Sequence, residues 1–311
     1  MILCVVPNTT IEHDWLIPGL QLGQAYHVNE PAILPSGKGM NVARAIKTLG
    51  GEPYCVGFLA GHSGEYYKDL VRQHGIPGEW VWVEGETRIS MALTDPTAEH
   101  TDATLVTEPG QMVSEANWEK LAEAARRNAR EAVMTCFSGS LPPGNPPGYF
   151  KRLVEQIQSE SCPVWVDCSG APLQEAIAAR AHGIKVNGIE LGEAMGLMID
   201  GVESAINAGM QLQSIGIEMA VITLGSRGSV MVSSQGAWLA MPPVVKTIST
   251  VGSGDAFLAG MMQGLSESKT LIESLRMATA AAAANTLQIG GGQFIRQEYE
   301  NLLDQVSIQV L

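Results

Sequence analysis

The sequence predicts an α/β protein: a wound, mostly parallel sheet with helices on both faces, and a small additional β-sheet. Two observations lead to this prediction. Short apolar runs alternate with amphipathic segments along the chain, which is typical of parallel strands joined by helical crossovers. Two stretches, residues 11–34 and 79–107, interrupt this alternation and carry only β-like patterning. No linker, repeat or low-complexity segment divides the chain, so we expect one domain spanning residues 1–311.

The expected strands are short apolar runs, as strands buried on both faces of a sheet should be. They are Val5–Val6, Cys55–Phe58, Ala132–Thr135, Val164–Asp167 and Ala220–Leu224. Helical patterns lie between them, at Asn41–Leu49, Glu65–His74, Glu115–Arg130, Tyr149–Ser159 and Leu173–Ala179. The run Ala281–Ala284 lies in a further helix-forming segment and is expected to pack closely.

The two β-only stretches are rich in Val, Thr, Trp and Ile and are punctuated by Pro and Gly, which predicts short antiparallel strands. Together they can form one small sheet outside the main one. Such a sheet would be a lid over the carboxyl ends of the parallel strands, where open α/β sheets bind ligands. Because exposed sheet edges tend to pair with other chains, a homodimer through the lid is a candidate assembly.

Composition excludes several classes of protein. Nineteen Lys and Arg against 32 Asp and Glu give a formal charge of -13, which disfavours sequence-independent nucleic-acid binding but leaves room for a local anion site. Five cysteines without a CxxC pair indicate a reducing, cytoplasmic setting rather than a disulfide framework. The apolar N-terminus lacks a basic region and is expected to be a first strand, and no segment is apolar enough to span a membrane. The six histidines show no metal-ligand spacing.

The strongest motif lies between Thr250 and Gly260. Gly252, Ser253 and Gly254 precede Asp255, which opens an apolar helix. Glycines allow close approach of the backbone, and the start of a helix offers unpaired N–H groups, so the segment can cradle a phosphoryl group. Asp255 at its edge could accept a proton from an attacking hydroxyl. The alternative is a tight turn in which the Asp only caps the helix, and on spacing alone it has about equal weight.

A second glycine-rich turn runs into a helix between Pro35 and Arg44. It is not a Walker A loop, because Gly39 rather than Ser or Thr follows Lys38. Lys38 and Asn41 are three residues apart and share a helix face. This arrangement suits a polyhydroxylated, anionic ligand, and the alternative is a surface turn with a solvated lysine.

The two motifs in this order resemble the ribokinase (phosphofructokinase B) family of carbohydrate kinases, in particular the branch of tagatose-6-phosphate kinase and 1-phosphofructokinase. The resemblance covers nearly the whole chain. Further segments are similar to that branch's motifs SGSLP, DxSG, KPNxxEL, SLGxxG and TRIN, respectively Ser138–Pro142, Asp167–Gly170, Lys185–Leu191, Thr223–Gly228 and Thr87–Ser90.

The resemblance implies an ATP- and Mg²⁺-dependent sugar kinase with roles for particular positions. Asp255 would be the catalytic base and Gly252, Ser253 and Gly254 the anion hole. Asn187 and Glu190 would organise magnesium, mainly through water, and the nucleotide phosphates. The nucleotide would lie along Lys185, Asn187, Thr223, Gly225 and Gly228, and the sugar along Gly37, Lys38, Gly39, Asn41 and Ser138. Arg88 would approach a sugar phosphate from the lid. Phosphoryl transfer needs positioning, a base and positive charge, which this set supplies.

The departures from the family pattern lie on the sugar side. Where the branch carries an Asp for the sugar hydroxyls, this chain has Glu12, with Asp14 two residues on and on the same strand face, so either carboxylate could serve. His27 stands where phosphosugar kinases carry an Arg in the first lid strand, and histidine is a weaker phosphate partner. Thr104–Thr107 replaces the family's TEIN.

Three functions remain open at this point. The leading one is a kinase of a ketose phosphate, with fructose 1-phosphate and tagatose 6-phosphate as first candidates. The second is a kinase of an unphosphorylated sugar or nucleoside in the same fold, which His27 and Leu105 favour and Lys38 and Arg88 oppose. The third is a non-catalytic sugar-phosphate sensor, which would not need Asp255. In each case the partner is a small molecule.

Overall fold

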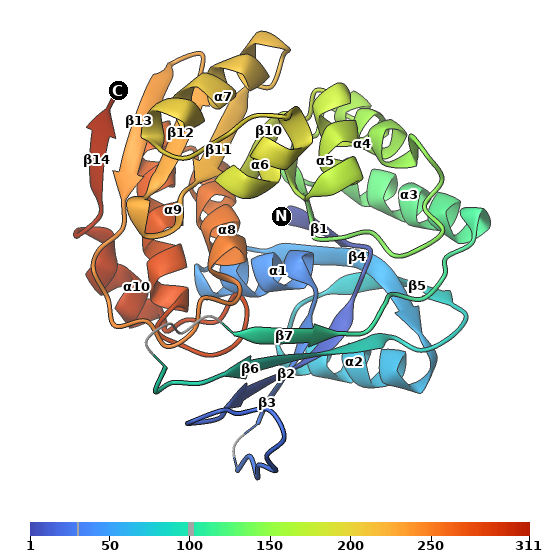
Figure 1. The fold of residues 1–311 in the computed structure, drawn as a ribbon. Helices are drawn as coiled ribbons and strands as arrows, with labels where there is room; N and C mark the ends of the chain where they lie inside the picture. Colours follow the sequence, from blue (N-terminus) through green and yellow to red (C-terminus); the bar gives the residue numbers. More distant parts are fainter. Residues whose placement is uncertain (30, 99–102) are drawn as a thin grey trace.

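The computed structural model describes residues 1–29, 31–98 and 103–311, so residues 30 and 99–102 of the two β-only stretches lie outside the described residues. The predicted fold class is confirmed. The described strands form a ten-stranded main sheet and a separate four-stranded sheet beneath it in Figure 1.

The main sheet runs in the order β14-β13-β12-β11-β10-β9-β8-β1-β4-β5. The strands from β11 to β5 are parallel, and β12, β13 and β14 add an antiparallel edge. Their bounds are β1 (Ile2–Val6), β4 (Pro53–Ala60), β5 (Gly78–Val83), β8 (Met134–Ser138), β9 (Val164–Asp167), β10 (Gly183–Asn187), β11 (Met219–Thr223), β12 (Ser229–Ser233), β13 (Gly236–Met241) and β14 (Ser307–Val310).

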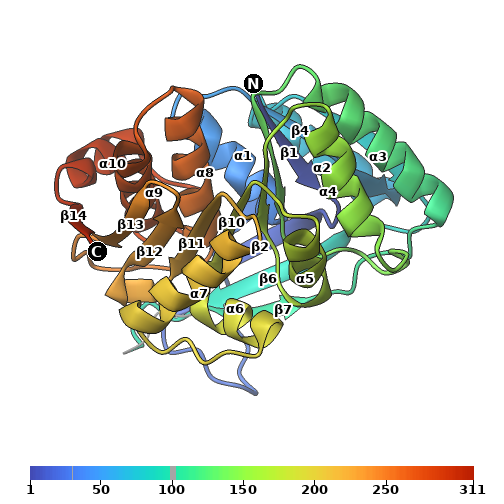
Figure 2. The same cartoon turned by 90° about the horizontal axis from the view of Figure 1, so that it is seen from above.

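Helices cover both faces of this sheet (Figure 2). One face carries α1 (Lys38–Thr48), α2 (Gly61–Gln73), α8 (Ser253–Ser266), α9 (Leu271–Asn285) and α10 (Arg296–Leu303). The other carries α3 (Glu115–Ala129), α4 (Tyr149–Ser159), α5 (Gly170–Ala178), α6 (Gly188–Met195) and α7 (Val202–Ser214). Strand β1 shows why both faces are apolar: Cys4 and Val6 join the first core and Leu3 and Val5 the second, because side chains alternate along a strand.

The small sheet has the order β3-β2-β6-β7, with β2 (Thr10–Leu16), β3 (Ala32–Ser36), β6 (Arg88–Thr94) and β7 (Thr104–Thr107). The expectation that the two β-only stretches combine into one sheet is confirmed, with two corrections. Strands β2 and β6 pair in parallel, although the outer pairs are antiparallel. Residues 78–83 form β5 of the main sheet, because they pair with β4 and extend the parallel register.

The segment between β2 and β3 is also a correction. Gly23–His27 was expected in a strand, but it lies outside any strand and is exposed. The segment folds back on itself instead, since the Tyr26 hydroxyl accepts the Gln21 N–H at 2.7 Å and donates to the Gly19 carbonyl at 3.1 Å. The backbone is therefore turned by local hydrogen bonds and does not extend the sheet.

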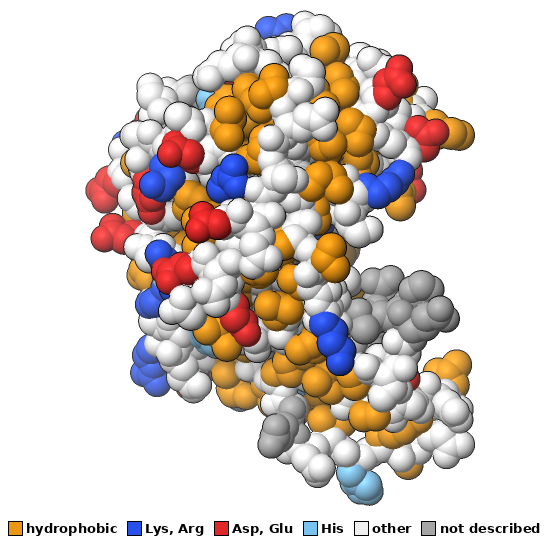
Figure 3. Space-filling model, turned by 90° about the vertical axis from the view of Figure 1, so that its left-hand side faces the viewer, with side chains coloured by type: hydrophobic (Ala, Val, Ile, Leu, Met, Phe, Trp, Pro, Cys, Tyr) orange, Lys and Arg blue, Asp and Glu red, His pale blue; other side chains and the backbone are white. Residues whose placement is uncertain are grey.

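Helix hydropathy, the state of the cysteines and the distribution of surface side chains test the expectations drawn from composition. Among the described residues no helix is both long and apolar enough to cross a membrane. The five cysteines are buried and unpaired. Acidic and basic side chains are interspersed on the face shown in Figure 3, and hydrophobic side chains also gather towards the lower part of that view. Leu105 and Val106 of β7 are among the exposed apolar side chains.

Candidate active site

Four predicted site residues are the last residues of four neighbouring parallel strands. Ser138 ends β8, Asp167 ends β9, Asn187 ends β10 and Thr223 ends β11. Ser138 lies opposite Asp167 and Asn187 lies opposite Thr223, and the register of β9 with β10 carries the second pair two residues beyond the first. The topology therefore gathers residues from four separate motifs at the carboxyl ends of the strands, where ligands bind in open α/β sheets.

Helix α8 begins as the glycine-rich motif predicts. Gly252 is its N-cap residue with a φ of 76°, in the left-handed region that favours glycine. A Cβ on Gly252 would overlap the backbone of Gly291, and a Cβ on Gly254 would lie 2.6 Å from Lys185 Nζ. Gly252 is therefore required both by its conformation and by the close approach of Gly291, whereas at Gly254 an added Cβ would only displace the end of the Lys185 side chain.

Asp255 lies in the first turn of α8 and is 4 % exposed. It does not cap the helix, because the N-cap position belongs to Gly252, so the capping alternative is wrong. Its Oδ2 accepts a hydrogen bond from Asn41 Nδ2 at 2.9 Å. Burial raises the pKa of Asp255 to about 7, with Lys38 acting in the opposite direction. A carboxylate with this pKa can take up a proton near neutral pH, as a general base must.

Two lysines surround the buried carboxylate of Asp167. Lys185 Nζ lies 2.7 Å from Asp167 Oδ2, and Lys38 Nζ lies 3.8 Å from Asp167 Oδ1. The charge of Asp167 raises the pKa of Lys38, so this lysine stays protonated. Lys38 is partly exposed, whereas Lys185 is buried. Asp167 therefore anchors positive charge beside the start of α8.

Asn187 and Glu190 form a capping box at the start of α6. Asn187 Oδ1 accepts the Glu190 N–H at 2.8 Å, and Glu190 Oε2 accepts the Asn187 N–H at 3.3 Å. The other carboxylate oxygen of Glu190 lies 3.9 Å from Lys38 Nζ. Within the described residues no cluster of three metal-ligating side chains is present. The pair therefore offers oxygens that suit a hydrated Mg²⁺ rather than a direct protein cage.

A cavity of about 400 Å³ joins the nucleotide and anion-hole motifs. Thr223, Gly225 and Gly228 line one part of it, and Ser253 and Gly254 line another. Its remaining wall is partly apolar, with side chains that include Val245, Phe257, Ala282 and Ala283. Residues predicted from two motifs thus share one cavity with a polar and an apolar part, as a nucleotide requires.

The glycine-rich turn before α1 lets this helix pack directly on strand β1. Gly37 is the N-cap of α1, and a Cβ on Gly39 would lie 2.8 Å from the Val5 carbonyl. A Cβ on Gly139, which follows Ser138, would lie 3.3 Å from Lys38 Cβ. The glycines therefore let Lys38 lie between the ends of β1 and β8.

Glu12 and Asp14 are both buried on β2, although they are acidic. Burial raises the pKa of both carboxyls, and in Asp14, where the charge of Glu12 adds to it, the pKa reaches about 7. Arg44, 5 % exposed on α1, acts on both in the opposite direction. The two carboxylates share one side of the strand as predicted, and buried hydrogen-bond acceptors of this kind suit sugar hydroxyls.

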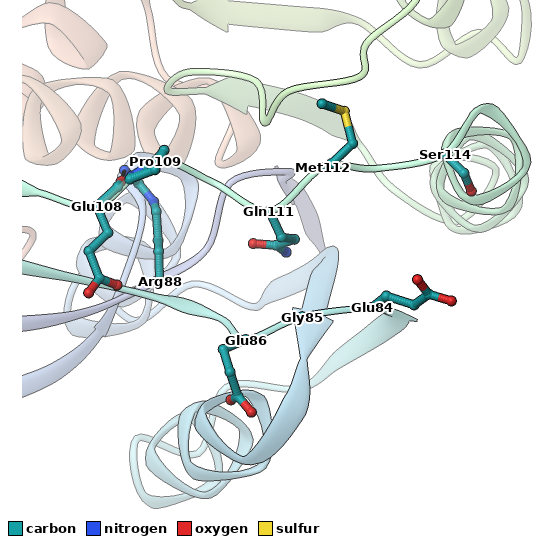
Figure 4. Close-up of a pocket in the computed structure, with 9 residues that line it drawn as sticks. All are labelled: Glu84, Gly85, Glu86, Arg88, Glu108, Pro109, Gln111, Met112 and Ser114. Atoms are coloured by element: carbon teal, nitrogen blue, oxygen red, sulfur yellow. Dashed lines mark hydrogen bonds between the residues drawn. The ribbon is translucent and has the colours of Figure 1, made fainter.

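Arg88 opens β6 at the edge of a second cavity of about 610 Å³ (Figure 4). Its guanidinium donates to the carbonyls of Glu108 at 3.3 Å and Asn8 at 3.4 Å. The other lining residues include Glu84 and Glu86. In Figure 4 the Gln111 side chain points between the segment at 84–86 and its own segment at 108–112. Arg88 is thus placed between the small sheet and the end of β1, but carboxylates line the cavity beside it.

Sequence reasoning missed two parts of the site. Arg44 was noted only as lying near the helix start, and the turn at 290–292 was not singled out at all. This turn packs on α1, because a Cβ on Gly291 or Gly292 would overlap Asn41. The only signal for it was the Gly290–Gly292 run after a helix-forming segment. His27, by contrast, lies on the exposed segment between β2 and β3.

Comparisons with known proteins identify the family of the chain. The model of the pfkB family carbohydrate kinases matches residues 9–297. The chain belongs to this family of carbohydrate kinases. It is 31 % identical to a 1-phosphofructokinase of Escherichia coli, over 94 % of this chain and 93 % of that protein.

Solved structures show the same fold. Phosphofructokinase-2 of Escherichia coli, in complex with potassium, superposes with a TM-score of 0.88 at 25 % identity and covers 98 % of both chains. Ribokinase of Thermotoga maritima superposes with a TM-score of 0.76 at 20 % identity, covering 98 % of this chain and 99 % of that one. The resemblance to the pfkB carbohydrate kinases is thereby confirmed, and membership implies ATP as the phosphoryl donor.

Proposed function

We propose that this pfkB-family kinase transfers the γ-phosphoryl group of ATP to a hydroxyl of a ketose phosphate, with fructose 1-phosphate as the first candidate and tagatose 6-phosphate as the second. The observation that carries the proposal is the position of Asp255, buried at the start of α8 and hydrogen-bonded to Asn41. The similarity to 1-phosphofructokinases over 94 % of the chain supports the order of the candidates.

In the proposed mechanism the acceptor hydroxyl lies against Asp255, which takes its proton as the oxygen attacks the γ-phosphorus of ATP. The bond from this phosphorus to the bridging oxygen breaks, and ADP leaves with that oxygen. The N–H groups at the start of α8 face the transferred group, and Gly252, Ser253 and Gly254 allow it to approach the backbone. Lys38 holds positive charge next to this point, because Asp167 and Glu190 keep it protonated. These contacts strengthen as negative charge develops on the phosphoryl group in the transition state.

The nucleotide is expected in the cavity lined by Thr223, Gly225 and Gly228, with its phosphates directed towards Ser253 and Gly254. Lys185 contributes its ammonium group next to Gly254, where Asp167 holds it by a hydrogen bond of 2.7 Å. Asn187 and Glu190 would hold Mg²⁺ through water, and the ion would neutralise charge on the nucleotide phosphates. Their oxygens fit this indirect role, because both side chains are already partly used in the capping box.

The sugar is expected between α1 and the small sheet, which would serve as the lid. Glu12 and Asp14 offer buried acceptors for its hydroxyls, and Ser138 Oγ is buried with no hydrogen-bond partner among the described residues. Arg88, from the small sheet, is the candidate partner of the substrate phosphate. The non-catalytic sensor is set aside, because the family is one of kinases.

The experiment is a kinase assay with ATP and Mg²⁺ against fructose 1-phosphate, tagatose 6-phosphate, fructose 6-phosphate, fructose and a nucleoside panel. We expect the highest kcat/KM for a phosphorylated ketose. Preference for an unphosphorylated sugar or a nucleoside would overturn the substrate proposal. It would favour the second candidate, which is supported by the exposure of His27 and the carboxylates around Arg88.

A homodimer through the small sheet is part of the proposal. Strand β7 is an edge strand, and its Leu105 and Val106 are 59 % and 54 % exposed. Exposed apolar side chains on an edge strand favour pairing with a second copy. Analytical ultracentrifugation of the wild-type chain and of Leu105→Lys tests this: we expect a dimer that the substitution weakens, and a wild-type monomer at micromolar concentration would contradict it.

A further inference from the structure

Arg44 is a buried cation at the centre of the sugar-side motif, one helical turn after Asn41. Its Nη1 donates to Asn41 Oδ1 at 3.2 Å and also to the Gly291 carbonyl, and its Nη2 donates to the Pro35 carbonyl. These acceptors come from α1, from the turn at 290–292 and from β3. One guanidinium therefore joins two neighbouring elements, β3 and α1, to a turn that lies 247 residues away in sequence.

The Arg44 contact determines which way the Asn41 carboxamide points. Asn41 Oδ1 accepts from both Ser36 Oγ, at 3.0 Å, and Arg44. With two donors on its oxygen, the carboxamide must direct its NH₂ group to the other side, where Asp255 Oδ2 lies at 2.9 Å. A carboxamide turned by 180° would place its oxygen against a carboxylate and its NH₂ against the Arg44 guanidinium, which can only donate.

Through Gly291, Arg44 also supports Gly252, the first glycine of the proposed anion hole. The backbone of Gly291 occupies the space that a Cβ on Gly252 would need, so the 290–292 turn packs directly against the start of α8. A shift of Gly291 would therefore displace the glycine whose left-handed conformation begins that helix. Arg44 thus contacts the supports of both the base and the cradle, although no direct bond to either is present.

We propose that Arg44 is a positioning residue for phosphoryl transfer, which aligns the Asn41 donor with Asp255 and holds the Gly291 turn against Gly252. The proposal rests on the proposed function, because it takes Asp255 to be the base. Lysine could not replace Arg44, since one ammonium has no planar fork that reaches three separated acceptors. The role differs from that of Lys38, which supplies charge.

The expected signature is a change in the pH dependence of kcat. A hydrogen bond to the ionised carboxylate favours that form, so loss of the Asn41 donor raises the pKa of Asp255 and moves the acid limb to higher pH. The charged groups that face Asp255 are Lys38 on α1, Asp167 on β9 and Lys185 on β10. Those that face Arg44 are Glu12 and Asp14 on β2, Tyr67 on α2, His74 at the end of α2 and Asp255 itself.

The experiment compares Arg44→Lys and Ser36→Ala with the wild type by pH–rate profiles, using the best substrate of the panel. Ser36→Ala removes the second donor on Asn41 Oδ1 and keeps Arg44 in place, so its pH profile is informative even where Arg44→Lys fails to fold. The same substitution also removes the hydrogen bond by which Ser36 lowers the pKa of Glu12. The control is Arg276→Met, because Arg276 also donates to a backbone carbonyl, that of Val306, but is not linked to Asp255. We expect the acid limb to rise by about 0.5–1 pH unit in Arg44→Lys and less in Ser36→Ala, with kcat reduced about tenfold and threefold.

Each result decides the proposal. A raised acid limb in Ser36→Ala and in folded Arg44→Lys, with an unchanged limb in Arg276→Met, supports it. A wild-type limb in Ser36→Ala and Arg44→Lys, or an equal rise in Arg276→Met, overturns it. Asp255→Asn separates the two levels of the argument: full activity of that variant removes the proposed base and with it the proposed function, whereas an inactive Asp255→Asn with an unshifted Arg44→Lys removes only the role of Arg44.

Discussion

Asn41 Nδ2 donates to Asp255 Oδ2 at 2.9 Å and so joins two residues 214 positions apart. The bond joins the first turn of α1 to the first turn of α8. The glycine-rich segment Pro35–Arg44 begins α1, and the glycine-rich segment Thr250–Gly260 begins α8. A residue expected to hold the sugar therefore also sets the environment of the expected base. The two motifs form one site through this contact.

Asp255→Asn should abolish turnover while sugar binding persists. The carboxamide keeps the size of the side chain but cannot accept the proton, and general-base loss typically lowers kcat by about 10²–10⁴-fold. The measurements are kcat and the sugar Kd, with Asp304→Asn as the control, since Asp304 is exposed at the end of α10. A variant that keeps more than half of the wild-type kcat would remove Asp255 from the mechanism.

The same substitution should stabilise the protein above neutral pH. The folded pKa of Asp255, about 7, lies above its ordinary value of 3.8, so the folded state binds the proton more tightly and loses stability as pH rises between these values. The ligand-free Asp255→Asn variant has no such loss. Its melting temperature should exceed that of the wild type by a few degrees at pH 8, and the gap should narrow towards pH 4.5. A gap that is equal or larger at pH 4.5 would contradict the raised pKa.

Arg88→Ala should raise KM for the phosphorylated ketose far more than for its unphosphorylated parent. A charge-assisted contact is worth about 1.5–3 kcal/mol, which corresponds to roughly 10–150-fold in KM. Arg72→Ala is the matched control, because Arg72 is exposed and its one ion pair within the described part of the chain is with Asp69, one turn away in the same helix. Equal effects of Arg88→Ala on both substrates would mean that Arg88 does not contact a substrate phosphate.

Gly252→Ala should disrupt the start of α8. An alanine there would be strained at a φ of 76° and would also overlap the Gly291 backbone. Gly170→Ala isolates the conformational part, since Gly170 has a φ of 60° and nothing lies within 4 Å of its added Cβ. We expect Gly252→Ala to lose much more melting temperature and activity than Gly170→Ala, as measured by calorimetry and kcat. Similar losses in the two would mean that the contact with Gly291 is unimportant.

Sugar and a non-hydrolysable nucleotide should together protect the small sheet from hydrogen exchange. Its strands β2 and β6 carry Glu12, Asp14 and Arg88, so closure over the ligand would order them and exclude water. We expect protection to rise more in β2, β3 and β6 than in α4, which packs on the face of the main sheet that carries α3 to α7. Unchanged exchange with ligand bound would mean that the small sheet is not a lid.

The elements that the sequence predicted best are those with a local signal. The apolar strand Val164–Asp167 and the helix Tyr149–Ser159 have the predicted bounds, because burial on both faces and helical periodicity are written in consecutive residues. The glycines at 252 and 254 predicted a close approach, although not what approaches. Strand β5 was misassigned to the small sheet, since its β-pattern does not say which sheet it joins.

The sequence alone determined the fold class, the two glycine-rich helix starts and the family to which they point, because each is a property of neighbouring residues. The tertiary structure decided which residues of the site contact one another. Asp167 pairs with Lys38 and Lys185, Arg44 donates to Asn41, and Gly291 packs against Gly252. These relationships join strands and turns that are distant along the chain. They depend on strand order and on which side chains are buried together, and no local pattern encodes either.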